Sequence, residues 1–321
     1  MRDSWGRTIE YVRISLTDAC NFCCPYCRPQ EITPSSQIHL LHPHEWMIIL
    51  EAFHRLGVKA VRLTGGEPLL YPHLDELLQR INETQWFEDI SMTTNGSYLG
   101  DRAKTLQQLG LNRVNISLDS IDPDMFDVCV GKPNQLNSVL RGIEASLAAG
   151  FKQVKINTVL SRYWSDEEVR TLFEYIDAWA VIWRFIEYMP FQGDAFHGPT
   201  FDEWRAQLER VCGEPLQSVD HVYGFGPATY YRLPSGKDIG FIFSMSHNYC
   251  DTCNRLRLTS DGHMRLCLLR DDESNLINLV RNGITVDELV RHIELTVQLK
   301  KQEHDGIDMD QPERPMWRIG G

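Results

Sequence analysis

Gly57-Val58-Lys59-Ala60-Val61 is the first of three related phrases in this chain; the others are Gly110-Leu111-Asn112-Arg113-Val114 and Gly150-Phe151-Lys152-Gln153-Val154. Before each glycine, apolar residues recur at helical spacing, and after the two variable residues the chain has the pattern of a strand. Glycine suits this place because it ends a helix in the left-handed conformation without steric cost. The repeat therefore predicts successive units of helix, turn and strand.

The same rhythm extends to six strands in the first 190 residues. The predicted strands are Tyr11–Leu16, Val61–Leu63, Ile90–Thr93, Val114–Leu118, Val154–Val159 and Val181–Ile186. Strands that alternate with helices pair into a parallel α/β sheet through right-handed connections, although periodicity does not show whether the sheet closes into a barrel. Ligands of such sheets bind at the carboxyl ends of the strands, where this sequence has Thr64, Thr94, Asp119 and Glu187.

The pattern changes after Pro190, which indicates a second region. The segments predicted there are a loop (191–199), a helix (200–211), short strands separated by Gly and Pro (217–267), a helix (286–301) and a loop after His304. We therefore predict two domains, a barrel domain over residues 1–216 and a smaller domain over residues 217–321.

Composition excludes several classes of protein. The chain has 321 residues, of which 42% are hydrophobic, and its net charge of -12 argues against a nucleic-acid-binding surface. No apolar run approaches the ~20 residues that span a bilayer, and the first residues lack the apolar stretch of a secretory signal. We expect a soluble, cytoplasmic protein with no membrane partner. The oligomeric state is left open, with a homodimer as one option.

Six of the nine cysteines form two spaced triplets. In the first, Cys20, Cys24 and Cys27 have C-x3-C-x2-C spacing, just after the first predicted strand. Three thiolates can hold three irons of a cubane cluster and leave the fourth iron open, whereas electron-transfer clusters normally have four Cys ligands. Structural zinc is the alternative, but it prefers four ligands in C-x2-C pairs. Outside the triplets, the cysteines interpreted as ordinary thiols are Cys23, Cys129 and Cys212.

The second triplet, Cys250, Cys253 and Cys267, has C-x2-C-x13-C spacing and again offers no obvious fourth ligand. Arg255 and Arg257 lie between these cysteines at alternate positions, so on a strand their side chains share one face. Two guanidiniums beside an open metal site suit a polyphosphate ligand. A zinc ribbon with two exposed arginines is the alternative interpretation.

Four further cationic residues lie within predicted strands: Arg13, Arg62, Lys155 and Arg184. A buried charge is costly unless it is paired, so these residues require phosphate groups or carboxylates as partners. The run Gly65-Gly66-Glu67-Pro68 follows the second strand, and Gly-Gly allows a ligand to approach the backbone closely.

The first triplet together with Gly65-Gly66-Glu67-Pro68 resembles the radical S-adenosylmethionine (SAM) superfamily. That resemblance implies a partial (β/α)6 barrel, similar to a TIM barrel, in which the open iron is chelated by SAM. From Arg13 to the terminal Gly320-Gly321, the chain is also similar to the GTP 3′,8-cyclase family of molybdenum cofactor biosynthesis.

The second resemblance implies a role for particular residues. Two [4Fe–4S] clusters would be held by Cys20, Cys24 and Cys27 and by Cys250, Cys253 and Cys267. SAM would be contacted by Tyr26, Gly66, Ser117 and Met189. GTP would be bound by Arg13, Arg62, Thr93, Lys155, Arg255, Leu256 and Arg257, with Arg184 as a further phosphate contact. Gly320 and Gly321 would form a tail that enters the active site and supports catalysis.

The implied reaction converts GTP to (8S)-3′,8-cyclo-7,8-dihydroguanosine 5′-triphosphate. Hydrogen is removed from the ribose 3′ carbon, and the resulting carbon radical attacks C8 of guanine. The implied partners are an electron donor similar to flavodoxin or ferredoxin and, downstream, cyclic pyranopterin monophosphate synthase. Two alternatives stay open: a radical SAM enzyme with an auxiliary cluster that acts on a peptide, and a non-enzymatic electron carrier or zinc-stabilised binding module.

Overall fold

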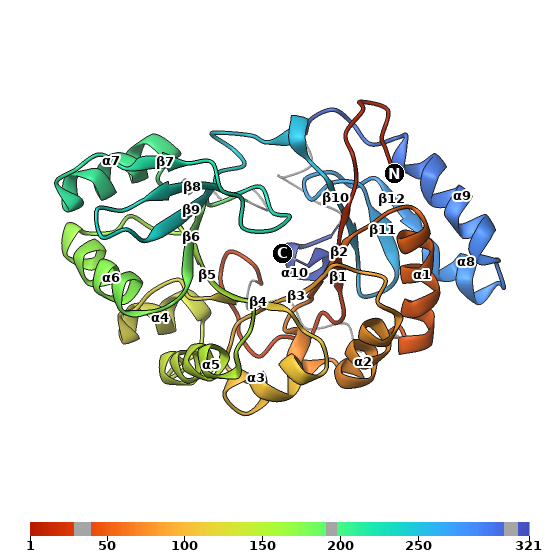
Figure 1. Ribbon diagram of the computed structural model, residues 1–321, viewed down its shortest axis with the longest axis horizontal. Coiled ribbons are helices and arrows are strands. Elements are labelled where there is room, and N and C mark those ends of the chain that lie inside the picture. Colours follow the sequence, from red (N-terminus) through yellow and green to blue (C-terminus); the bar gives the residue numbers. More distant parts are fainter. Residues whose placement is uncertain (29–39, 191–197, 305–313, 321) are drawn as a thin grey trace.

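One curved sheet organises the molecule (Figure 1). The computed structural model describes residues 1–28, 40–190, 198–304 and 314–320. Within these ranges a 12-stranded sheet has the order β12-β11-β10-β1-β2-β3-β4-β5-β6-β9-β8-β7. The strands are β1 (Tyr11–Ser15), β2 (Ala60–Thr64), β3 (Asp89–Thr94), β4 (Arg113–Ser117), β5 (Gln153–Val159), β6 (Ile182–Ile186), β7 (Gln217–Val219), β8 (Thr229–Arg232), β9 (Asp238–Ile242), β10 (Arg255–Leu258), β11 (His263–Arg265) and β12 (Glu273–Asn275).

Helices cover the outer, convex side of this sheet (Figure 1). They are α1 (Pro43–Arg55), α2 (Leu74–Thr84), α3 (Leu99–Gln108), α4 (Pro123–Val130), α5 (Leu136–Ala149), α6 (Asp166–Ala178), α7 (Phe201–Cys212), α8 (Leu276–Arg281) and α9 (Val286–Val297), with 3-10 turns η1 (Pro68–Leu70) and η3 (Cys250–Thr252). The short helix α10 (Met316–Ile319) instead lies on the concave side, near the middle of the molecule (Figure 1).

Local sequence explains where these helices begin and end. Gly57, Gly110 and Gly150 all have left-handed backbone, with φ of 81°, 101° and 78°, as the repeated phrase predicts. Ser165 and Thr200 begin α6 and α7 with reciprocal capping boxes, in which each hydroxyl accepts a bond from the backbone three residues on.

The sheet forms a partial barrel, which confirms the predicted fold class. Strands β1 to β6 pair in parallel and in chain order. All five residues of β2 are buried, because helices cover one side and the barrel interior the other. The sheet order ends at β12 and β7, so the described strands do not close into a ring.

The region after residue 217 continues this sheet. β10 pairs in parallel with β1, and β9 pairs in parallel with β6. The division into domains at residues 1–216 and 217–321 stays a prediction. One expectation was wrong: the tail after His304 was expected to be loop, yet α10 is a helix. Periodicity cannot detect four residues, and this helix is held by burial of Met316 and Trp317. Among the described residues, no helix has the length and apolar character required to cross a bilayer.

Candidate active site

The first cysteine triplet lies at the carboxyl ends of the parallel strands, as predicted. Cys20, Cys24 and Cys27 line a cavity of about 230 Å³ together with strand-end residues such as Thr64 and Asp119. The thiols are partly buried, and strands β1 to β6 all contribute residues to the lining of the cavity. The described structure therefore places three thiols where a ligand of this fold is expected.

Gly65 and Gly66 allow the cysteine loop to pack against β2. A Cβ on Gly65 would lie 2.6 Å from the carbonyl oxygen of Thr17, and a Cβ on Gly66 would overlap the carbonyl of Ala19. The Gly66 amide donates a 2.6 Å hydrogen bond to the Thr17 carbonyl. Gly65-Gly66 was expected to allow a ligand to approach the backbone closely. In the structure, the group that approaches these glycines is the backbone of the cysteine loop.

Glu67 anchors the neighbouring loop. Its buried carboxylate accepts hydrogen bonds from Thr94 Oγ1 at 2.7 Å, from the Asn95 amide at 2.8 Å and from the Leu69 amide at 3.0 Å. Burial raises the pKa of Glu67 to about 7, against the opposing effect of these three donors. Glu67 therefore fixes the turn after β3, and Asn95 in that turn approaches Cys20 Sγ at 3.9 Å through Nδ2.

Asp119 holds Tyr26 in place beside the triplet. Its carboxylate accepts a 2.7 Å hydrogen bond from the Tyr26 hydroxyl and a 2.8 Å bond from the Val159 amide. Burial raises the pKa of Asp119 to about 6. Tyr26, predicted to contact SAM, is thereby tied to the ends of β4 and β5.

Burial favours the protonated form of two thiols in the first triplet. Burial raises the pKa of Cys27 to about 12 and that of Cys24 well above its usual range, and neighbouring thiols add to both shifts. Thiols like these ionise when a metal binds, with release of protons. In the described residues no group of three His, Cys, Asp or Glu side chains converges on a point suitable for a metal ion. The fit to a cluster rests on the three thiols that line one cavity.

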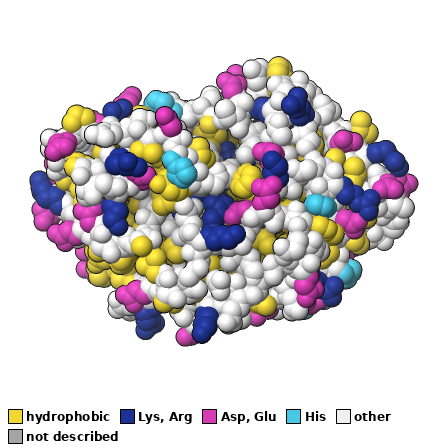
Figure 2. Space-filling view, in the orientation of Figure 1, with side chains coloured by type: hydrophobic (Ala, Val, Ile, Leu, Met, Phe, Trp, Pro, Cys, Tyr) yellow, Lys and Arg dark blue, Asp and Glu magenta, His cyan; other side chains and the backbone are white. Residues whose placement is uncertain are grey.

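Three arginines from neighbouring strands lie side by side in register. Arg13 on β1 is level with Arg257 on β10 and with Arg62 on β2. Burial first, then Arg257 and Arg62, lowers the pKa of Arg13 well below its usual value, and burial likewise lowers the pKa of Arg257 to about 10. Lys and Arg side chains gather near the centre of the face shown in Figure 2. Crowded, desolvated cations of this kind favour a polyanionic ligand.

Other polar groups in the cavity have unsatisfied hydrogen-bonding capacity. Thr93 Oγ1, the Tyr11 hydroxyl and Arg184 Nε are buried and have no hydrogen-bond partner among the described residues. All three residues line the cavity. Because buried polar groups are normally paired, these atoms are suited to contact a polar ligand.

Lys155 and Arg184 occupy different surroundings. Arg184 donates to Asn115 Oδ1 at 2.7 Å and to Asn157 Oδ1 at 2.6 Å, and it lines the cavity. Lys155 instead donates to the Tyr223 carbonyl and does not line the cavity formed by the described residues. Burial, followed by the charges of Arg184 and other arginines, lowers the pKa of Lys155 to about 5. Its contact with GTP stays a prediction.

The second triplet lines an adjoining cavity of about 70 Å³. Cys250, Cys253 and Cys267 meet there with Arg255 and Arg257. Burial opposes ionisation of Cys253, but the charges of Lys300 and Arg255 lower its pKa to about 7. This thiol is therefore prepared to bind a metal as the thiolate.

The chain tail reaches the arginines. Arg257 Nη1 donates a 2.6 Å hydrogen bond to the Gly320 carbonyl. A Cβ on Gly320 would lie 2.5 Å from Thr64 Oγ1 and 3.1 Å from Ser15 Cβ, so only glycine fits in this position. The entry of the tail into the active site was expected from resemblance alone and stays a prediction; the structure places the Gly320 carbonyl at Arg257. Gly321 lies outside the described residues.

The remaining predicted site residues differ in whether they line the larger cavity. Gly66, Ser117, Met189 and Arg255 line the larger cavity. Leu256 does not, because its side chain is buried in the hydrophobic core while the arginines beside it face the cavity. Its predicted contact with GTP therefore concerns only its backbone.

Sequence reasoning missed several cavity residues. Tyr11 and Asn157 lie on predicted strands at inward positions, so strand alternation could have identified them. Met316 had no usable signal, because it lies in a tail expected to be loop.

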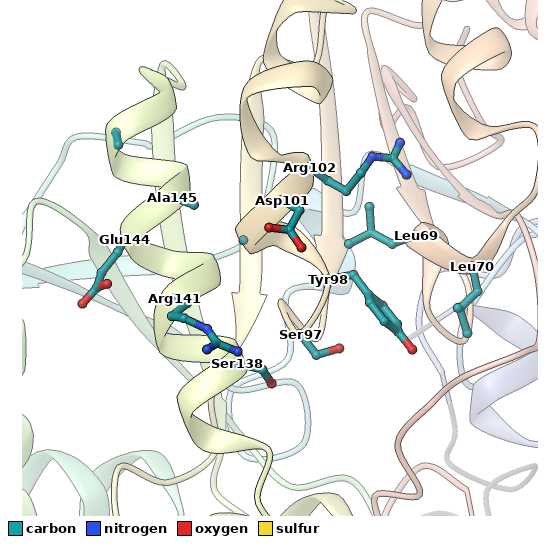
Figure 3. Close-up of a pocket in the computed structure, with 12 residues that line it drawn as sticks. Leu69, Leu70, Ser97, Tyr98, Asp101, Arg102, Ser138, Arg141, Glu144 and Ala145 are labelled. Carbon is teal, nitrogen blue, oxygen red and sulfur yellow. The ribbon is translucent and has the colours of Figure 1, made fainter.

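A larger groove lies elsewhere, on the outer surface between η1, α3 and α5 (Figure 3). It has a volume of about 980 Å³ and contains no cysteine. Arg102 in its lining is paired with Asp75. We do not assign the substrate to this groove, because the convergent thiols and cations lie inside the barrel.

Comparisons with known proteins agree with this geometry. Residues 14–176 match the model of the radical SAM superfamily, and residues 181–306 match Molybdenum Cofactor Synthesis C. A GTP 3′,8-cyclase of Listeria welshimeri is 35% identical and covers 100% of this chain and 99% of its own length. The chain belongs to the GTP 3′,8-cyclase family. A Moorella thermoacetica member of this family is 37% identical, with 100% of both chains covered.

A mouse protein is similar to this chain to about the same degree. Molybdenum cofactor biosynthesis protein 1 of Mus musculus is 36% identical over 100% of this chain and 51% of its own length. Membership of the GTP 3′,8-cyclase family and of the radical SAM superfamily implies SAM and a [4Fe–4S] cluster. It also disfavours the electron-carrier and zinc-module alternatives.

Solved structures support the fold of this family member. Streptococcus suis SuiB bound to precursor peptide SuiA has a TM-score of 0.65 at 12% identity, with 98% of this chain and 75% of that chain covered. Native anSMEcpe with bound AdoMet has a TM-score of 0.57 at 15% identity, with 96% and 93% covered. At these identities the likeness shows a shared fold.

The low pKa of Lys155 leads to a test of stability. Replacement of Lys155 by methionine is expected to stabilise the metal-free protein by about 1–4 kcal/mol at neutral pH, because folding no longer requires a buried lysine to lose its proton. Between the folded pKa of about 5 and the unfolded value of 10.5, the unfolded chain binds more protons, so the destabilisation by Lys155 decreases as pH rises. The advantage of Lys155→Met should therefore be larger at pH 6 than at pH 9 in urea unfolding.

Lys59 provides the matched control. It is half exposed and pairs with Glu10 at 2.7 Å, so Lys59→Met should change stability little. An advantage of Lys155→Met that stays constant from pH 6 to pH 9 would contradict a neutral Lys155 in the folded protein.

Proposed function

We propose that this protein converts GTP to (8S)-3′,8-cyclo-7,8-dihydroguanosine 5′-triphosphate, the first step of molybdenum cofactor biosynthesis, and that it acts as a lyase. The observation that carries the proposal is the row of Arg257, Arg13 and Arg62 inside a barrel that also contains two cysteine triplets. The row matches a triphosphate, and the thiols match iron–sulfur clusters.

Two [4Fe–4S] clusters are part of the proposal. Cys20, Cys24 and Cys27 would hold the first, and Cys250, Cys253 and Cys267 the second. When bound, the first cluster with SAM supplies a radical that abstracts hydrogen. Tyr26, Gly66, Ser117 and Met189 would contact SAM, and all four line the cavity of the first triplet.

The arginines would bind and orient GTP. Arg13, Arg62 and Arg257 would neutralise the triphosphate, and ligand charge would raise their lowered pKa values toward the usual range. Arg255 is held over the Tyr249 ring at 4.7 Å, which fixes its guanidinium at the junction of the two cavities. Triphosphate binding at a distance from the reacting atoms can position the ribose for hydrogen abstraction.

Smaller polar groups would complete substrate recognition. Thr93 Oγ1 has no partner in the described structure and is suited to contact GTP. Lys155 would contact GTP only if its bond to the Tyr223 carbonyl were replaced. The Gly320-Gly321 tail would support catalysis from its position at Arg257.

An external protein similar to flavodoxin or ferredoxin would donate the electron. The outer groove of Figure 3 offers a route to the first triplet: Ser97 Oγ donates to Asn95 Oδ1 at 2.7 Å, and Asn95 Nδ2 approaches Cys20 Sγ at 3.9 Å. The product would pass to cyclic pyranopterin monophosphate synthase. We place the reaction in the cytoplasm and keep a homodimer as an option.

The decisive experiment is anaerobic incubation of the cluster-loaded protein with GTP, SAM and a reductant. We expect 5′-deoxyadenosine and a nucleotide with the mass of GTP whose ribose C3′ is bonded to C8, identified by mass spectrometry and NMR. 5′-Deoxyadenosine without any modified GTP would contradict the proposal. A peptide substrate is not favoured, because the full-length relatives named above are GTP 3′,8-cyclases.

A further inference from the structure

The tail helix α10 contacts the end of the cysteine loop, residues 18–28. The Arg28 guanidinium lies 5.2 Å from the centre of the Trp317 ring. Arg28 directly follows the last cysteine of the first triplet, and its amide donates a 2.8 Å hydrogen bond to the Cys24 carbonyl. Its Nη1 donates to the Cys20 carbonyl at 3.4 Å. Arg28 therefore contacts both the tail and the backbone of two cysteines of the triplet.

The tail residues on either side of Trp317 contact the same loop. Arg318 pairs with Asp18, at the start of the loop, at 3.7 Å, and its guanidinium lies 5.0 Å from the centre of the Trp317 ring. Met316 is a buried member of a small apolar cluster, and Cys27 packs against this cluster. Three consecutive residues of the tail thus reach both ends of the cysteine loop.

The contact between Arg28 and Trp317 is shielded from water. Arg28 is 8% exposed and Trp317 is 1% exposed. An arginine over an indole ring is most favourable when the pair is desolvated in this way. Trp317 Nε1 is buried and has no hydrogen-bond partner among the described residues, so the polar interactions of this side chain are those of its ring with the two guanidiniums.

The tail also has an anchor that does not involve the cysteine loop. Arg314, just before α10, pairs with Asp261 at 2.8 Å and with Glu273 at 2.7 Å. Asp261 lies in the turn between β10 and β11, and Glu273 lies on β12. Because this anchor is independent of the loop, loss of the Trp317 ring should loosen the tail without releasing all of it.

We propose that Trp317 is a positioning residue: it acts through Arg28 and couples the docking of the C-terminal tail to the order of the loop that would hold the first cluster. The proposal rests on the function proposed above, which assigns a cluster to this loop. Coupling between two sites is reciprocal, so a docked tail favours an ordered cysteine loop, and an ordered loop favours a docked tail.

The test measures hydrogen–deuterium exchange of the full-length protein by mass spectrometry, in residues 18–28 and 316–320. Trp317→Leu removes the ring and keeps an apolar side chain, whereas Arg28→Met removes the charge and keeps a long side chain. Trp164→Leu is the matched control. Trp164 is buried with the Arg162 guanidinium 4.6 Å from its ring, and it is not among the described residues that line the two cavities.

In the metal-free protein, Trp317→Leu should speed exchange of the cysteine loop by about 5- to 30-fold, the factor that corresponds to loss of a desolvated cation–π contact. Arg28→Met should speed exchange of the tail by a similar factor, because the coupling is reciprocal. In a protein that already carries Trp317→Leu, Arg28→Met should not speed exchange of the tail further, since both changes remove the same contact. Trp164→Leu should leave both segments at the wild-type rates.

A second measurement uses the protein loaded anaerobically with iron and sulfide. Loading should slow exchange of the tail in the wild type, because a cluster orders the loop that the tail contacts. The slowing should be smaller in Arg28→Met. If the slowing persists in full in Arg28→Met, it comes from the second triplet, and the proposed coupling is overturned.

Other outcomes would also overturn the proposal. Faster exchange of the tail in Trp317→Leu with an unchanged cysteine loop would show that Trp317 holds the tail without any coupling to the loop. If Trp317→Leu does not fold, a wild-type rate of tail exchange in Arg28→Met overturns the proposal. Wild-type protein that makes no cyclised GTP would refute the proposed function, and the exchange rates, measured without substrate, would still decide the coupling.

Discussion

Arg257→Ala is expected to weaken GTP binding by about 10- to 100-fold, because a hydrogen bond to a charged group contributes about 1.5–3 kcal/mol. Arg257 is buried at the end of the arginine row and lines both cavities. Burial lowers the pKa of Arg257 to about 10, and Arg257→Ala also loses the hydrogen bond to the Gly320 carbonyl, so the melting temperature of the variant is compared with that of the wild type. SAM binding should change little, since the predicted SAM contacts come from other residues.

Calorimetry of GTP and of SAM binding to the cluster-loaded variant measures both effects. Arg232→Ala is the control, because Arg232 is exposed and pairs with Asp238 at 2.8 Å outside the cavity. Arg257→Lys should give intermediate affinity, since lysine keeps the charge and loses the two-pronged geometry. GTP affinity equal to the wild type in Arg257→Ala would exclude Arg257 from the triphosphate site.

The arginine row also shows what the sequence could predict. Alternation along one strand places Arg255 and Arg257 on a single face, and the glycine-marked repeat predicts the parallel strands that contain Arg13 and Arg62. The register that makes Arg257, Arg13 and Arg62 neighbours could not be predicted, because it depends on β10 joining β1 across more than 240 residues of chain. Pairing of distant strands has no local signal.

Local geometry limited the prediction of individual side chains. Lys155 was assigned to GTP by resemblance, but the carbonyl that it contacts belongs to Tyr223, in a loop whose position no periodicity shows. Gly66 was assigned to SAM, and the structure adds a reason that applies without any ligand, the close approach of Ala19. Contacts between a strand and a distant loop depend on tertiary packing, which the local pattern of a single sequence does not predict.

The tail gives the largest expected effect on turnover. Gly320→Val should abolish most formation of cyclised GTP while the protein stays folded. The backbone at Gly320 is left-handed, with φ of 76°, and a Cβ would lie 2.5 Å from Thr64 Oγ1. The left-handed conformation costs about 1–2 kcal/mol for a residue with a side chain. Loss of the hydrogen bond from Arg257 to the Gly320 carbonyl adds about 1.5–3 kcal/mol.

Together these costs should lower the population of the docked tail by about 70- to 4000-fold, and product formation with it. Gly213→Val separates backbone strain from the steric conflict, because Gly213 has φ of 77° at the end of α7 and open space around its Cβ. That control should lose some stability and keep its activity. The readouts are the rate of cyclised nucleotide formation and the melting temperature of each variant.

A substitution that removes the Thr64 side chain tests the same steric argument from the other side of the contact. Thr64→Gly deletes both the side chain that Gly320→Val would meet and the hydroxyl that donates 3.1 Å to the Ile14 carbonyl. The double variant should regain part of the activity lost by Gly320→Val, because the clash is relieved while the left-handed strain remains. Equal activity of Gly320→Val and the wild type would mean that the tail acts without entering the space between Thr64 and Arg257, and the steric argument for glycine would then fail.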